Sequence, residues 1–120
     1  MSITRANLLV SARWQARQHV SEADSLTGTQ WGNCLLRAWR RLWTVHPEAF
    51  HVDGELVGEL PDLPTVDATL VPVCPEWIDV LGAAAAADAL GNMSVEDPER
   101  AAVVAGVVQT LEARFARGVG

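Results

Sequence analysis

Apolar residues recur at helical spacing in three stretches of the chain, and a fourth stretch is an alanine-rich run that begins after a proline and stops at Gly91 and Asn92. Within the three periodic stretches roughly every third or fourth position is apolar, which is the period of an amphipathic α-helix. The last helix is expected to bury a stripe made of Ala101, Val104, Val107, Val108, Leu111 and Phe115. The pattern predicts helices from Ile3 to about Glu22, from Trp31 to His46, from Pro75 or Glu76 to about Leu90, and from Pro98 onward.

The stretch from Trp31 to His46 has the strongest pattern. On a helical wheel its apolar residues share a broad arc of about 200°, and its three arginines lie on the other side. The centre of the arc, with Leu35, Ala38 and Leu42, is expected to pack in the core. The whole arc consists of Trp31, Cys34, Leu35, Leu36, Ala38, Trp39, Leu42, Trp43 and Val45.

Capping residues and prolines mark where these helices begin and end. Thr27 or Thr29 can cap the second helix through a side-chain oxygen. Pro47 should end that helix, because the residue before a proline avoids the helical conformation. Asp97 followed by Pro98 is typical of a helix start and predicts where the last helix begins.

The segment of about residues 48–75 has a different character. Asp53 and Gly54 lie between two short apolar runs, which predicts a β-hairpin with a two-residue turn. Prolines then punctuate the segment and argue against a central strand. We therefore predict one mainly α domain over residues 1–120, with about four helices in a small bundle. A hairpin and proline-rich strap is inserted between the second and third helices.

Charge is divided unevenly along the 120 residues, which carry a net charge of −6. Residues 1–46 contain six arginines against two acidic residues, whereas residues 47–120 contain three arginines against thirteen acidic residues. The two parts can attract each other within one fold, or they can present opposite charges to partners. We favour the first interpretation.

Composition excludes several classes of chemistry. The chain has no lysine and no tyrosine, so it lacks a Schiff-base lysine, a P-loop lysine and a tyrosine acid or base. No apolar run reaches the ~20 residues of a membrane span, and no export signal is found, so we expect a cytoplasmic protein with two free thiols and no contact with a membrane. Arginine as the only strong cation suggests a prokaryotic origin.

Cys34 is the strongest candidate nucleophile. The string QWGNCLLRAW around it resembles the nucleophile segment of papain-like and ovarian-tumour-type cysteine peptidases, where a glycine precedes a cysteine at a helix start. The resemblance covers ten residues and implies a nucleophilic Cys34 with His51 and Asp53 as its downstream partners. Helical periodicity instead assigns Cys34 to the apolar face, and core packing is the favoured prediction.

Besides His19, four residues carry soft metal-binding atoms: Cys34, His46, His51 and Cys74. Two cysteines and two histidines are enough for a tetrahedral zinc site. Their spacing includes no Cys-x-x-Cys pair and does not match a compact zinc finger. We therefore predict neither a metal nor another cofactor.

The second predicted helix also offers a surface for partners. Arg37, Arg40 and Arg41 lie on its polar side, and Trp43 and Leu36 lie at the edge of its apolar arc. Tryptophan and arginine are enriched at binding hot spots, and a small bundle cannot cover so wide an arc.

The sequence therefore predicts a non-enzymatic interaction module, such as an adaptor, inhibitor, assembly chaperone or accessory subunit. Its partner would be another protein or a second copy of the chain. The alternatives are a small cysteine-dependent enzyme using Cys34 and a nucleic-acid-binding protein using Arg37, Arg40 and Arg41. The acidity of the chain makes nucleic acid an unlikely partner.

Overall fold

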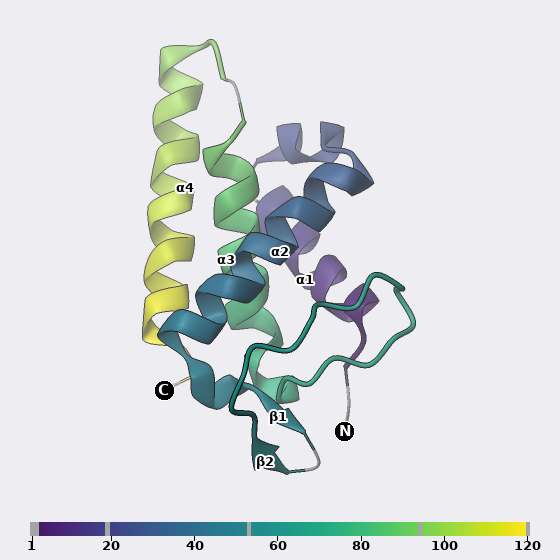
Figure 1. Ribbon diagram of the computed structural model, residues 1–120. Coiled ribbons are helices and arrows are strands. Elements are labelled where there is room, and N and C mark those ends of the chain that lie inside the picture. The colour runs from purple at the N-terminus through teal and green to yellow at the C-terminus, as the bar shows by residue number, and fades with distance from the viewer. Residues whose placement is uncertain (1–2, 19, 53, 94, 120) are drawn as a thin grey trace.

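The computed structural model describes residues 3–18, 20–52, 54–93 and 95–119. Within these residues four α-helices pack together (Figure 1), which confirms the predicted mainly α fold. They are α1 (Arg5–Arg17), α2 (Gly28–Val45), α3 (Ile78–Gly91) and α4 (Pro98–Arg117). Short elements join them: the 3-10 helices η1 (Ser21–Ser25), η2 (Pro47–Ala49) and η3 (Pro75–Trp77), and the strands β1 (His51–Val52) and β2 (Glu55–Leu56).

Helix α3 lies at the centre and contacts each of the other three helices. Every residue from Val80 to Ala87 is buried, as expected of a helix that is apolar on all sides. Its alanines let the surrounding helices approach closely. Among the described residues, no helix has the length and apolar character of a membrane-spanning segment.

The first helix is shorter than the sequence predicts. Thr4 caps α1 in a capping box with Asn7, and the helix ends at Arg17 rather than near Glu22. Val20 adopts an extended conformation and is fully buried, so the chain leaves the helix to place this side chain in the core. Glu22 consequently lies in η1.

The other predicted helix ends lie within three residues of the observed ones. Helix α2 begins at Gly28 rather than Trp31, and α3 begins at Ile78, after the 3-10 helix η3, rather than at Pro75 or Glu76. Thr27 caps α2 in a second capping box, and the helix ends at Val45, two residues before Pro47. Asp97 caps α4 by accepting a hydrogen bond from the Glu99 amide, and Pro98 is the first helical residue. Local capping chemistry therefore determines where these helices begin.

The segment between α2 and α3 forms a small hairpin and an extended strap. Strands β1 and β2 pair antiparallel, and Gly54 in their turn has φ of +82°. Asp53, the other predicted turn residue, lies outside the described residues. The strap is held on both sides: Trp39 of α2 donates its indole hydrogen bond to the Pro61 carbonyl at 2.8 Å, and the main-chain amide of Ala6 in α1 donates to Asp67 at 3.0 Å.

Gly82 marks the closest approach of α1 to α3. A Cβ atom at this position would lie 2.4 Å from Ser11 Oγ and 2.8 Å from Gln15 Nε2. Both distances are far below van der Waals contact, so only glycine lets α1 pack here without displacement. A close approach, rather than an unusual backbone angle, requires this glycine.

We expect Gly82→Ala to lower the free energy of unfolding by about 1–3 kcal/mol, because the added methyl group displaces the side chains of Ser11 and Gln15 from their hydrogen-bonded positions. Gly91→Ala is the matched control, since Gly91 lies in the same helix and a Cβ there meets nothing within 4 Å. It should change stability by less than about 1 kcal/mol. Urea denaturation followed by tryptophan fluorescence measures both, and equal stabilities would contradict the close approach.

Candidate functional site

Two of the three arginines predicted to bind a partner instead join helices of their own chain. Arg37 forms a two-pronged ion pair with Asp88 of α3, with nitrogen–oxygen distances of 2.9 and 2.6 Å. Arg41 forms a similar pair with Glu112 of α4, at 2.9 and 2.5 Å. Arg40 is exposed. The basic first part and the acidic second part of the chain therefore attract each other within the fold, which is the favoured interpretation of the charge pattern.

The apolar edge of α2 is also partly covered. Trp43 is half-buried and packs edge-on against Phe50, with ring centroids 5.4 Å apart. Leu36 is half-buried as well, whereas Leu35, Ala38 and Leu42 are fully buried as predicted. The predicted partner-binding residues of α2 thus include only one side chain, that of Arg40, that is both exposed and without an ion pair among the described residues.

Cys34 has the properties of a core residue, as the sequence predicts. It is 4% exposed, and burial together with the neighbouring Asp88 raises the pKa of its thiol to about 11. His51 lies against a different cysteine, with 3.0 Å between its Nδ1 and the sulfur of Cys74. Burial and the charge of Glu76 raise the pKa of Cys74 too, so neither thiol has the lowered pKa of an activated nucleophile. Asp53 lies outside the described residues.

Cys34, His46, His51 and Cys74 do not converge on one site. Within the described ranges, no group of three or more His, Cys, Asp or Glu side chains could hold a metal ion. His46 is buried at the end of α2, where its Nε2 lies 2.7 Å from the Phe115 carbonyl oxygen and its ring packs against Trp77. It joins the ends of α2 and α4 and has a structural role.

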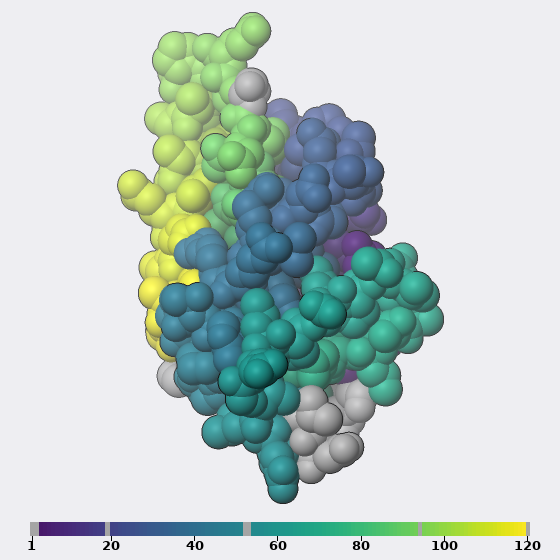
Figure 2. All heavy atoms as spheres, in the orientation of Figure 1, coloured from purple at the N-terminus to yellow at the C-terminus, as the bar shows by residue number. Residues whose placement is uncertain are grey.

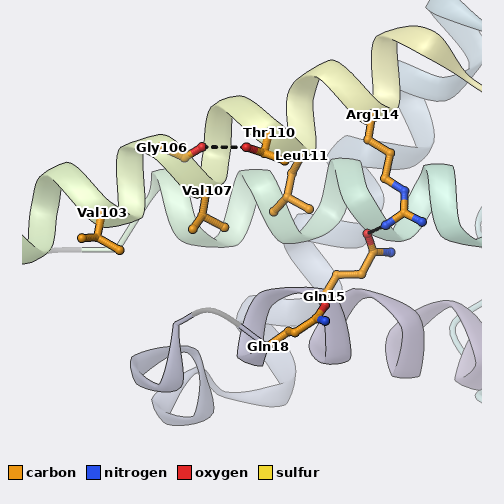
Figure 3. A pocket seen from close by; sticks show the side chains of 8 residues that line it. All are labelled: Gln15, Gln18, Val103, Gly106, Val107, Thr110, Leu111 and Arg114. Atoms are coloured by element: carbon orange, nitrogen blue, oxygen red, sulfur yellow. Dashed lines mark hydrogen bonds between the residues drawn. The ribbon is translucent and has the colours of Figure 1, made fainter.

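A groove of about 350 Å³ runs between α1 and α4 (Figure 3). On the α4 side Val103, Val107 and Leu111 follow one another at four-residue spacing and point into it. The opposite wall is polar and comes from Gln15 and Gln18 at the end of α1. The groove exists because α1 and α4 both pack on α3, which leaves one face of α4 uncovered.

A buried polar network lies at one end of this groove. Gln15 is 2% exposed, and its Oε1 accepts a hydrogen bond from Arg114 at 3.0 Å. Its Nε2 donates to Ser11 Oγ at 3.1 Å and to the Asp79 carbonyl at 3.0 Å. These bonds link α1, α3 and α4, so they hold the two walls of the groove at a set separation. Every polar group of the Gln15 side chain is thereby satisfied.

An ion pair attaches α4 to η1 near the other end of the groove. Arg100, which precedes the groove-lining residues of α4, binds Glu22 of η1 with nitrogen–oxygen distances of 2.7 and 2.8 Å. Hydrogen bonding to Arg100 is the main cause that lowers the pKa of Glu22 from 4.5 to about 2. The polar contacts of Arg100 and Arg114 thus lie before and after the apolar residues of α4 that line the groove.

Trp14 is a surface residue that the sequence reasoning missed. It is 59% exposed and lies beside Val10, which is 67% exposed, over a hollow that Ser11, Asp79 and Ile78 help to line. The signal was present in the helical wheel of α1, where both residues point away from the buried face.

Comparisons with protein-family models, with curated proteins and with solved structures found no match to this chain. Two surface features lie outside α2, the helix in which the sequence predicts partner-binding residues. They are the groove between α1 and α4 and the exposed side chain of Trp14. Both lie next to the Gln15 network, because Gln15 lines the groove and its partner Ser11 lines the hollow beside Trp14.

The Glu22–Arg100 pair should make stability depend on acid. The pKa of Glu22 is lower in the folded protein than its ordinary value, so the pair stabilises the fold above pH 4.5 and this stabilisation is lost as the pH falls toward 2. Glu22→Gln should therefore lose less stability than the wild type over that range. Urea midpoints across the range measure the difference, with Glu96→Gln, at an exposed site, as the control. The same dependence of the urea midpoint on pH in the wild type and in Glu22→Gln would contradict this prediction.

Proposed function

We propose that the protein is a non-enzymatic interaction module that binds a helix of a protein partner in the groove between α1 and α4. The observation that carries this proposal is the row of Val103, Val107 and Leu111 along α4, which faces a groove that the chain leaves open. Val103 is 50% exposed. Amphipathic helices bind such grooves through apolar side chains at this spacing.

The class of function is the one that the sequence predicts, but the proposed surface differs. Arg37 and Arg41 are occupied by Asp88 and Glu112, so they are poor anchors for a partner. The predicted surface has no exposed tryptophan, because Trp43 is half-buried, whereas Trp14 is exposed. Trp14 lies four positions before Gln18, which lines the groove, so the two residues are on the same side of α1 and Trp14 can contact a partner bound there. An adaptor, inhibitor, assembly chaperone or accessory subunit would each use such a face.

The alternatives have less support. A cysteine enzyme needs a reactive thiolate, whereas the pKa of Cys34 is raised and His51 is paired with Cys74. Nucleic-acid binding through Arg37, Arg40 and Arg41 would have to displace two carboxylates in a chain of net charge −6. Free thiols at Cys34 and Cys74 are consistent with the cytoplasmic location that we propose.

Two valines of equal exposure test which surface binds. Val103 borders the groove and is 50% exposed, while Val45 ends α2 and is 49% exposed. Helical peptides selected from a displayed library against the whole protein serve as the probe, with affinity measured by fluorescence anisotropy. Val103→Asp should weaken binding of the selected peptides by roughly tenfold or more, because a charge would be buried against the partner's apolar face.

Val45→Asp should leave the affinity unchanged. Circular dichroism should show equal helix content for both variants, because both side chains are half-exposed. Loss of peptide binding in Val45→Asp or Arg40→Glu, with binding retained in Val103→Asp, would assign the site to α2 and overturn the groove proposal.

A further inference from the structure

We infer that the helix bound at this groove is α4 of a second copy of the chain, so that the protein forms a two-fold symmetric dimer. This inference rests on the proposed function, because it uses the α4 wall of the same groove. Figures 1 and 2 show α4 along the outer edge of the bundle, where a second helix can reach it.

One exposed stripe of α4 has the spacing of a helix–helix contact. Six residues follow one another at intervals of four, three, four, three and four, which keeps them on one side of a helix that packs against another helix. All six are exposed, and three of them also line the groove. The stripe consists of Glu99, Val103, Gly106, Thr110, Ala113 and Arg117.

This stripe is complementary to itself when two copies run antiparallel. Its positions are symmetric about residue 108, so each residue meets a defined counterpart in the second copy. Glu99 then faces Arg117 of the second copy, and the two-fold axis repeats this pair. Val103 faces Ala113 in the same way, and Gly106 faces Thr110, so each larger side chain meets a smaller one.

Charge at the two ends of α4 favours the antiparallel arrangement. Glu99 lies in the first turn and Arg117 in the last turn, and neither forms an ion pair within the described parts of the chain. A parallel arrangement would place like charges together at both ends, whereas the antiparallel one pairs opposite charges and opposes the two helix dipoles. The charge pattern therefore identifies a second copy, rather than an unrelated helix, as the occupant.

The centre of the stripe suits a close crossing of two helices. A Cβ at Gly106 would meet nothing within 4 Å in one copy, so the glycine is not required for the fold of the single chain. A glycine, a threonine and an alanine at the contact allow two helix axes to approach to the short end of the usual 8–10 Å range. Val107, half-buried beside the stripe, adds apolar area from the groove.

Charge reversal tests both the interface and its register. Sedimentation equilibrium of the wild-type protein should give a concentration-dependent dimer. Glu99→Arg and Arg117→Glu should each raise the dissociation constant roughly tenfold or more, because two like-charged pairs replace two opposite-charged pairs. A mixture of the two variants, or the double variant, should restore the dimer. Glu55→Arg, an exposed charge reversal in β2, is the control and should have no effect.

Gly106→Leu tests the close approach without changing charge. It should abolish the dimer while leaving the unfolding transition of the monomer intact, because Gly106 is exposed and a Cβ there meets nothing within 4 Å in one copy. A wild-type protein that stays monomeric, or a dimer unaffected by these α4 variants, would overturn the inference. If Val103→Asp still abolished binding of the selected peptides in that case, the groove proposal would stand; if it did not, the groove proposal would fail as well.

Discussion

The structure depends on burying α3 on every side. A helix with six alanines among its 14 residues gains little from any one contact, so several neighbours must cover it closely. Helix α1 reaches it only because Gly82 leaves room for Ser11 and Gln15. Because Gln15 is buried there, its hydrogen bonds to Asp79 and Arg114 become obligatory, since unsatisfied buried groups are costly. One glycine thus determines both a packing distance and the network at the end of the groove.

Pairing of opposite charges arranges the other helices around α3. Arg37 and Arg41 project from the polar side of α2 and reach carboxylates on α3 and α4 respectively. These ion pairs join the basic first part of the chain to its acidic second part, so the uneven distribution of charge is explained without a binding partner. It also means that a surface rich in arginine and tryptophan in the sequence need not be a free surface in the fold. The faces left open are determined by which helices the ion pairs bring together.

Much of the fold could be predicted from the sequence because its signals are local. Helical periodicity located three of the helices and the alanine-rich run located α3. Thr27 and Asp97 marked two of the helix starts, and the wheel of α2 placed Cys34 in the core. The candidate site could not be predicted in this way. The groove follows from α1 and α4 packing on a common neighbour, and the exposure of Trp14 follows from the side of α1 that faces α3. Both are consequences of tertiary arrangement, which a periodic pattern in one helix does not contain.

Helix α4 connects the stability of the fold to its proposed function. Of its 20 residues only Val104, Leu111 and Phe115 are buried, so much of its surface is left open. Arg41–Glu112 and Arg100–Glu22 add to its attachment, but partly exposed ion pairs contribute little to stability. A helix so weakly covered gains more from an added apolar contact than a fully packed one. Because a partner helix on the exposed stripe would bind only the folded arrangement, association there and docking of α4 are thermodynamically linked.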